Sequence, residues 1–223
     1  MSQKTATQGD VALSVRALVK NVVFDRLPGT LRRGPAGSKR IALTFDDGPD
    51  DLTEQYLDLL DDLGVPATFF LIGENCAARP ELVREYRRRG HQIASHGYDH
   101  TRFPKLGRKE LLDQCARTET ALGGQTTGRP WVRPPHGSLD IASGVTLIAA
   151  GYTIALWSVS SCDYEIRTPE GLVEICAPDK VKGGDVLLFH EGQQWTINAL
   201  PRIVTALHAA GLECVTMHDL FAK

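Results

Sequence analysis

The chain has 223 residues, of which 42% are hydrophobic and 23% are charged, a composition that fits a globular domain and excludes a disordered chain. Its 25 basic and 27 acidic side chains leave a net charge of −2, so we expect no nucleic-acid partner, which would call for a basic domain. No run approaches the roughly 18 apolar residues of a membrane-spanning helix, and we expect no such segment.

The cysteine content favours free thiols in a reducing compartment. An odd number of scattered cysteines, with no Cys-x-x-Cys pair, argues against a disulfide framework and against a thiolate zinc site. The apolar stretch at residues 11–24 is interrupted by Arg16 and Lys20 and lacks the cleavage site of a signal peptide. We therefore expect a cytoplasmic or membrane-peripheral protein. The cysteines are Cys76, Cys115, Cys162, Cys176 and Cys214.

Residues 1–39 are predicted to form an N-terminal extension that is partly helical or loop, with a short helix at residues 11–23 and a Gly-, Pro- and Arg-rich loop at residues 27–40. From residue 40 onward, strand-like apolar runs alternate with amphipathic helical patterns. Strands are expected at residues 40–45, 67–72, 92–95, 131–133, 153–158, 185–189 and 213–216. Helices are expected at residues 52–63, 80–89, 108–122, 141–150, 169–177 and 197–210.

The ends of these helices carry recognisable signals. Pro80 suits a first helical position, and glycines such as Gly64 and Gly211 fall where helices should stop. An alternation of strands and helices predicts a mainly parallel sheet covered by helices. We therefore expect a single α/β domain over residues 40–223.

A first polar cluster follows the first strong strand and has the sequence TFDDGP. It contains two adjacent carboxylates, Asp46 and Asp47. Because neighbouring side chains of a strand point to opposite faces, one carboxylate can bind a metal while the other does a different job. The alternative is a simple acidic turn before Gly48 and Pro49.

A second cluster, with the sequence HGYDH, carries His96 and His100. Two imidazoles four residues apart can reach one metal from a single helical turn or a tight loop. A pair of exposed histidines is the alternative. Together with Asp47, the two histidines of this motif would make three protein ligands and leave open positions on the metal, which is typical of a catalytic zinc site.

A third cluster, RPPHG, begins with Arg133 at the end of a strand. An arginine there can clamp a carboxylate with two hydrogen bonds. The two prolines that follow have no backbone N–H, so His136 offers the first N–H after the arginine and could donate to an oxyanion. A structural surface turn is the alternative.

The remaining clusters are residues 157–164 and the strand that ends in His190. A single histidine at a strand end is more often structural than catalytic, but all five clusters lie at the carboxyl ends of predicted strands, where α/β folds bind ligands. Because neighbouring strands lie about 4.8 Å apart, five strand ends in an open sheet would spread over roughly 20 Å. A closed sheet brings them to one mouth, so we expect a barrel.

In this order, the five motifs resemble those of the polysaccharide deacetylases, also called the NodB-homology family and family four carbohydrate esterases. They are TFDDGP, HGYDH, RPPHG, a Trp-Ser segment that ends in Asp and an aromatic residue, and LLFH. The resemblance runs from about residue 40 to the C-terminus. It implies a distorted (β/α) barrel and metal-dependent hydrolysis of acetyl groups from N-acetylated, sometimes O-acetylated, sugars.

By position, the resemblance implies that Asp47, His96 and His100 hold the metal, usually zinc, with another divalent ion such as Co²⁺ as an alternative. It implies an N-acetylated glycan or glycoconjugate as the substrate.

The same resemblance implies that Asp46 is the catalytic base and Arg133 its orienting partner, and that His190 is the general acid, held by Asp163. Physical chemistry agrees, because zinc acidifies water, a nearby guanidinium favours the ionised carboxylate, and an amine leaves only when protonated. We expect the His136 N–H to help hold the oxyanion.

Four positions depart from the family pattern. Gly97 replaces the usual Ser or Thr, His136 stands where tyrosine is common, Ser160 where aspartate is frequent, and Tyr164 where tryptophan is usual. We expect these changes to bear on substrate fit more than on the reaction.

Two other functions remain as alternatives. A barrel hydrolase of a non-sugar C–N bond could use the same metal set. A catalytically silent glycan-binding relative would have lost a base, a ligand or an acid, and none is lost here. Trp195, close after the last motif, could stack on a sugar ring or pack in the core.

Overall fold

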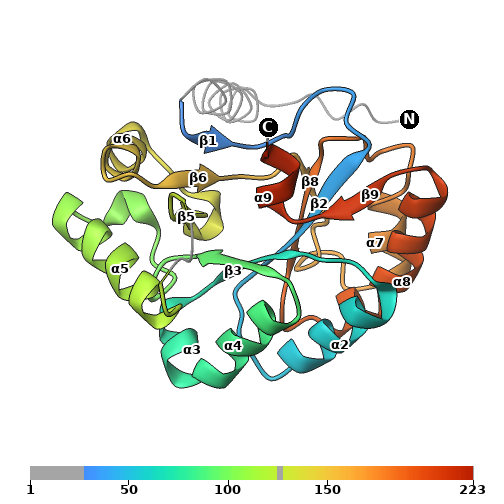
Figure 1. The fold of residues 1–223 in the computed structure, drawn as a ribbon, viewed down its shortest axis with the longest axis horizontal. Helices are drawn as coiled ribbons and strands as arrows, with labels where there is room; N and C mark the ends of the chain where they lie inside the picture. The colour runs from blue at the N-terminus through green and yellow to red at the C-terminus, as the bar shows by residue number, and fades with distance from the viewer. Residues whose placement is uncertain (1–27, 125–127, 223) are drawn as a thin grey trace, which may run out of the picture.

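The computed structural model describes residues 28–124 and 128–222. The helix expected at residues 11–23 lies outside the described residues. In the described part, parallel strands form one nine-stranded sheet in the order β1-β6-β5-β4-β3-β2-β8-β7, and β9 pairs with β2 (Figure 1). The strands are β1 (Thr30–Leu31), β2 (Arg40–Asp46), β3 (Thr68–Leu71), β4 (Gln92–Ser95), β5 (Trp131–Val132), β6 (Thr153–Ala155), β7 (Val159–Ser160), β8 (Val186–His190) and β9 (Glu213–Val215).

Helices surround this sheet, and most lie on its outer side (Figure 1). None of the helices in the described ranges is both long and apolar enough to cross a membrane. They are α2 (Thr53–Leu63), α3 (Gly73–Ala78), α4 (Pro80–Arg88), α5 (Arg108–Ala121), α6 (Ile141–Ala149), α7 (Pro169–Ile175), α8 (Gln194–Ala209) and α9 (Met217–Phe221), with short 3₁₀ turns η1 (Phe103–Lys105) and η2 (Pro135–Gly137).

The barrel is distorted because its two edge strands, β1 and β7, do not pair with each other in the described part of the chain. One segment spans the gap between them. The Leu156 N–H donates to the Leu31 carbonyl of β1, and two residues later the Ser158 N–H donates to the Val186 carbonyl of β8. The single strand expected at residues 153–158 is therefore wrong: it ends at Ala155, and the chain crosses from one edge of the sheet to the other.

The expected alternation of strands and helices is confirmed, and each of the six predicted helices is present with its ends within three residues of the prediction. The elements that the sequence analysis missed are short. The predicted loop at residues 27–40 contains β1, and α3, α9 and β7 were not expected. Elements of two to six residues are too short to show a period of two or of 3.6 residues.

Strand β2 shows how the sequence builds both sides of the barrel wall. Ile41, Leu43 and Phe45 are buried in the apolar cluster shared with the outer helices. The alternate residue Ala42 belongs to an inner cluster with residues of β3, β8 and α9. Because successive side chains of a strand alternate, Asp46 shares the inner face with Ala42. Burial on both faces explains why the strand reads as an almost continuous apolar run.

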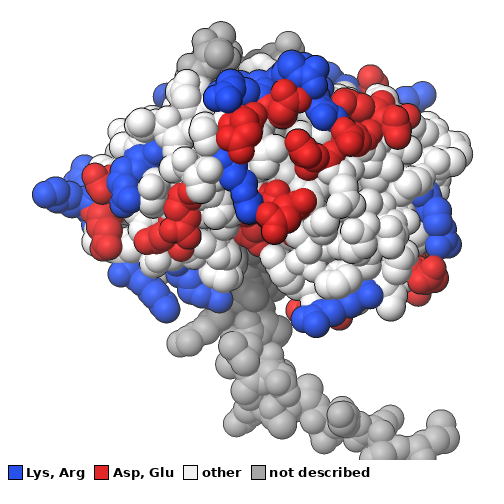
Figure 2. Space-filling view, turned by 90° about the horizontal axis from the view of Figure 1, so that it is seen from below, with Lys and Arg blue, Asp and Glu red and all other residues white. Residues whose placement is uncertain are grey.

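Charged side chains lie on the outer surface, with both signs interspersed on the face shown in Figure 2. Some pair between elements. Arg89, which follows α4, contacts Asp58 and Asp61 of α2, the latter at 3.0 Å. Exposed pairs of this kind contribute little to stability, so the apolar core dominates.

Phe45 is central to that core, with its ring 5.1 Å from Phe69 and 5.6 Å from Phe189 between ring centres. We predict that Phe45→Ala lowers the free energy of unfolding of the metal-free protein by about 3–5 kcal/mol, measured by chemical denaturation. Ile141→Ala is the control, because this α6 side chain is 65% exposed and its loss should change stability by no more than about 0.5 kcal/mol. Equal, small effects of both variants would contradict this packing.

Candidate active site

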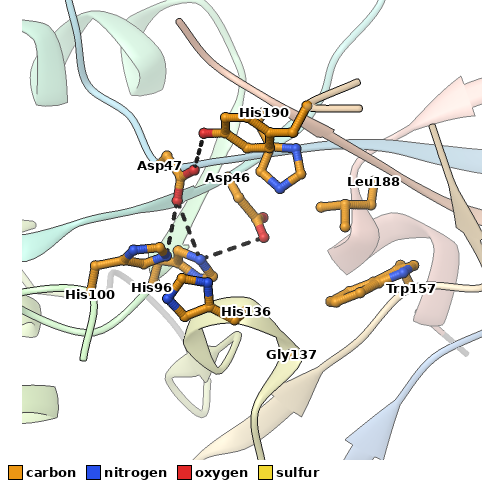
Figure 3. A pocket seen from close by; sticks show the side chains of 10 residues that line it. Asp46, Asp47, His96, His100, His136, Gly137, Trp157, Leu188 and His190 are labelled. Atoms are coloured by element: carbon orange, nitrogen blue, oxygen red, sulfur yellow. Dashed lines mark hydrogen bonds and ion pairs between the residues drawn. The ribbon is translucent and has the colours of Figure 1, made fainter. Parts of the chain in front are cut away.

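A pocket of about 350 Å³ lies at the carboxyl ends of the strands (Figure 3). The five sequence motifs all contribute to it, so the predicted convergence at one mouth is confirmed. The residues that line it are Asp46, Asp47, His96, His100, His136, Gly137, Trp157, Tyr164, Leu188 and His190.

Asp46 and Asp47 both line this pocket although they are neighbours in the chain. Asp46 is the last residue of β2. Asp47 has left the strand and adopts a left-handed backbone conformation with φ of 78°. Aspartate tolerates this conformation better than most residues. The turn therefore brings two adjacent carboxylates to one cavity, which regular strand alternation would prevent.

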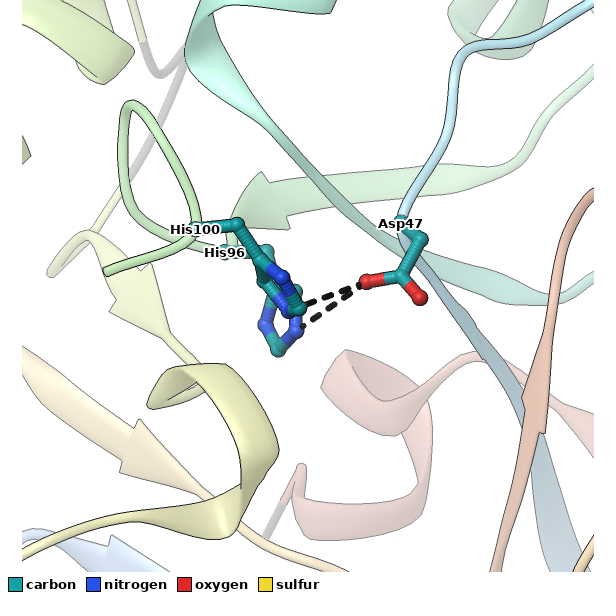
Figure 4. Close-up of side chains that lie close together, drawn as sticks. All are labelled: Asp47, His96 and His100. Atoms are coloured by element: carbon teal, nitrogen blue, oxygen red, sulfur yellow. Dashed lines mark ion pairs between the residues drawn. The ribbon is translucent and has the colours of Figure 1, made fainter. Parts of the chain in front are cut away.

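Asp47, His96 and His100 form the one group of metal-ligand type found among the described residues (Figure 4). Asp47 Oδ1 lies 3.5 Å from His96 Nε2 and 3.2 Å from His100 Nε2. Two ligand atoms of a tetrahedral zinc ion, each bound at about 2.0–2.2 Å, are about 3.3–3.6 Å apart. Both distances from Asp47 Oδ1 are close to this spacing, and the ligand atoms of all three residues lie within 4.8 Å of one another.

The polar groups of this cluster also fit a cation. Asp47 Oδ1 is buried and has no hydrogen-bond partner, a costly arrangement that a bound cation would relieve. His96 Nδ1 lies 2.9 Å from the Arg133 carbonyl oxygen. Because a carbonyl only accepts hydrogen bonds, Nδ1 carries the proton and Nε2 is free to bind a metal. Burial lowers the pKa of His96 to about 3, which keeps the imidazole neutral, as a metal ligand must be.

Asp46 is held by Arg133 on the inner side of the barrel. The Arg133 guanidinium is fully buried, and its Nη1 donates to Asp46 Oδ1 at 2.6 Å and to Thr44 Oγ1 at 2.9 Å. Burial raises the pKa of Asp46 above its ordinary value, and Arg133 opposes the rise. The expected effect of Arg133, which favours the ionised form of this carboxyl, is therefore present, but the effect of burial is larger. A raised pKa makes Asp46 a stronger proton acceptor.

His190 contacts Asp163 as the sequence analysis expects. Its Nδ1 lies 2.7 Å from Asp163 Oδ1, and its backbone N–H donates to Asp163 Oδ2 at 2.8 Å. Thr196 Oγ1 donates to the same Oδ2 at 3.2 Å, so the buried carboxylate is well fixed. Burial by itself lowers the pKa of His190, but the hydrogen bond and charge of Asp163 raise it above the ordinary value.

His136 lies beside the metal-ligand group, with its ring centre 4.3 Å from that of His100. Its backbone has a φ of 56°, and its N–H donates to no acceptor within the described ranges. A Cβ on the next residue, Gly137, would lie 2.6 Å from the Trp157 ring, so only glycine fits there. Pro134 and Pro135 have fixed φ angles, so the backbone of the turn is restrained, and the His136 N–H remains available.

The sequence analysis missed several contacts of the site. The Tyr164 hydroxyl donates to Asp47 Oδ2 at 2.6 Å. Trp195 does not line the pocket; it packs against the core, and its Nε1 donates to the Asp163 carbonyl at 2.8 Å. Leu188 shares the inner face of β8 with His190, which the alternation of the strand could have revealed.

Comparison with known proteins gives consistent matches. Residues 33–155 match the family model described as polysaccharide deacetylase. The chain is 34% identical to the peptidoglycan-N-acetylglucosamine deacetylase PgdA of Listeria monocytogenes over 83% of its length, and it spans 40% of that protein. It is 30% identical to a chitooligosaccharide deacetylase of Sinorhizobium fredii, over 82% of this chain and 92% of that protein.

Solved structures agree with these sequence matches. The Bc1960 peptidoglycan N-acetylglucosamine deacetylase, solved in complex with a hydroxamate-type benzamide, superposes with a TM-score of 0.81 at 30% identity. The match covers 86% of this chain and 92% of that one. The distorted barrel expected from the sequence is therefore confirmed.

We predict that the purified protein binds one zinc ion per chain and that His100→Ala abolishes this binding, because the variant loses one of three protein ligands. Metal analysis after gel filtration measures the result. His208→Ala is the matched control, since His208 is exposed near the end of α8. A His100→Ala variant that retains a full equivalent of zinc would contradict the ligand set.

Proposed function

The chain belongs to the polysaccharide deacetylase family, and from this premise we propose that it hydrolyses the acetamide group of N-acetylated sugars with a zinc ion held by Asp47, His96 and His100. One observation carries the proposal. The three metal-ligand residues, a carboxylate suited to be a base and a histidine suited to be an acid all line one pocket.

When bound at these residues, zinc supplies Lewis-acid chemistry: it lowers the pKa of water toward 7 and polarises the acetyl carbonyl. The chain's own residues then have to move two protons, one away from the attacking water and one onto the departing nitrogen. Asp46 and His190 are placed for these two tasks.

Asp46 takes the proton from the attacking water. Arg133 occupies Oδ1, so Oδ2 is the oxygen that accepts the proton, and it lies 3.6 Å from His96 Nε2 on the side of the metal ligands. Its proximity to the ligand set places the base next to the water that it activates. The fixed guanidinium prevents the carboxylate from turning away.

His190 donates a proton to the nitrogen of the breaking C–N bond. Asp163 holds Nδ1, which leaves Nε2 as the atom that gives up the proton. An amine is a poor leaving group unless it is protonated, so this step completes the hydrolysis to acetate and a free amino sugar. The raised pKa keeps His190 charged to higher pH than an ordinary histidine.

The His136 N–H is suited to donate a hydrogen bond to the oxygen that becomes negative during attack. The restrained turn around Pro135 and Gly137 holds it before the substrate arrives, so little reorganisation is needed. Relatives that act on peptidoglycan N-acetylglucosamine and on chitooligosaccharides support an N-acetylglucosamine-containing glycan as the substrate class.

We predict that the zinc-loaded protein releases acetate and free amine in equal amounts from N-acetylglucosamine oligomers or peptidoglycan fragments. Asp46→Asn should reduce the rate about 10²–10⁴-fold, because the amide cannot accept the proton. The control is Asp62→Asn, an exposed aspartate of α2, which should keep full activity. Failure to release acetate from any acetylated sugar, with zinc shown to be bound, would overturn the proposed function.

We predict that Asp163→Asn moves the alkaline limb of the pH–rate profile to lower pH. The acid acts only when His190 is protonated, so activity falls as the pH rises through its pKa. Asp163 raises that pKa, and loss of its charge lowers it. Initial rates between pH 5 and 9 measure the shift, with Asp62→Asn as the unshifted control. An alkaline limb at the same pH in Asp163→Asn would show that His190 is not the acid.

A further inference from the structure

We propose that Tyr164 is a positioning residue for the metal site: its hydroxyl holds Asp47 so that a single carboxylate oxygen faces the two histidines. The inference rests on the proposed function, because it concerns how tightly the same ligand set binds zinc. The sequence analysis expects Tyr164 to affect substrate fit. The inference gives it a different role, which is to hold Asp47, one of the three candidate metal ligands.

The two oxygens of Asp47 have different surroundings. Oδ2 accepts a hydrogen bond from the Tyr164 hydroxyl at 2.6 Å. Oδ1 is buried without a hydrogen-bond partner and lies within 3.5 Å of His96 Nε2 and His100 Nε2. The hydroxyl therefore determines which oxygen is left for the metal.

This contact also favours a single bond between the carboxylate and the metal. A phenol is a hydrogen-bond donor at neutral pH, and a charged acceptor makes its hydrogen bond short and strong. The hydrogen bond occupies one of the two lone pairs of Oδ2 and draws electron density from this oxygen, so it favours binding of the ion through Oδ1. A carboxylate held through one oxygen leaves more of the ion's positions open, which catalysis requires.

Tyr164 is itself held in place although its side chain is 44% exposed. Its ring centre lies 4.4 Å from that of His190. Its carbonyl accepts a hydrogen bond from Arg167 Nε at 3.0 Å, and the preceding residue is the buried Asp163. The segment that carries the hydroxyl is therefore held in place beside His190.

The test is zinc titration of the metal-free protein in competition with a chromophoric chelator. Tyr164→Phe removes only the hydroxyl and keeps the ring beside His190. Loss of such a partner of a metal ligand costs about 10–100-fold in affinity, and we expect the Kd for zinc to rise by this factor.

Tyr98→Phe is the matched control. Tyr98 lies between the two histidine ligands in the chain, and its ring stacks under Arg117 at 3.6 Å, but its hydroxyl has no hydrogen-bond partner among the described residues. The same chemical change should therefore leave the Kd unchanged. The alkaline limb of the pH–rate profile should also stay in place in Tyr164→Phe, because Asp163 still holds His190.

A Kd for Tyr164→Phe within about twofold of the unaltered protein would overturn the inference, while zinc binding by the unaltered protein would leave the proposed function standing. Absence of zinc binding by the unaltered protein would overturn both. Tyr164→Leu separates the hydroxyl from the ring: a loss of affinity seen only in this variant would assign the effect to ring packing and contradict the inference.

Discussion

A buried guanidinium lies at the centre of the barrel, and the geometry of the site depends on it. Arg133 has no exposure to solvent. Besides its contact with Asp46, it donates a hydrogen bond to the Leu156 carbonyl, where the chain crosses between the sheet edges. Its guanidinium also lies 3.9 Å from the centre of the Phe70 ring. Removal of one partner of a buried ion pair costs about 3–5 kcal/mol, so Arg133 and Asp46 stay paired in one arrangement. The contacts of Arg133 connect β2, β3 and the closing segment, and they turn the free oxygen of Asp46 toward the metal ligands.

The site divides its chemistry between pairs of neighbouring residues. Asp46 and Asp47 come from one turn, yet the first is paired with Arg133 and the second faces the histidines. Asp163 and Tyr164 repeat this arrangement on the other side of the pocket, since the first contacts His190 and the second donates a hydrogen bond to Asp47. Each of these two short segments contains a residue with positive φ, Asp47 in the first and Cys162 in the second. Their contacts help bring Asp46, Asp47 and His190 to one pocket.

Much of the fold and of the candidate site could be predicted from the sequence. Amphipathic helices such as α2 and α8 show their period clearly. Each polar motif follows an apolar strand, which places it at the ligand-binding edge. The two-residue strands β1 and β7 carry no such pattern. The contact between Tyr164 and Asp47 was out of reach: the two residues are 117 positions apart, and only the folded chain brings them together. The net pKa shift of Asp46 depends on how deeply it is buried, a quantity that motif order does not contain.

The central claim is that Asp47, and not Asp46, binds the metal together with His96 and His100. Anomalous X-ray scattering at the zinc absorption edge, from crystals of the zinc-loaded protein, tests it most directly. The account predicts one peak within bonding distance of Asp47 Oδ1 and the two histidine Nε2 atoms, with Asp46 still paired to Arg133. A peak bonded to Asp46, or a zinc ion located away from these three residues, would contradict it.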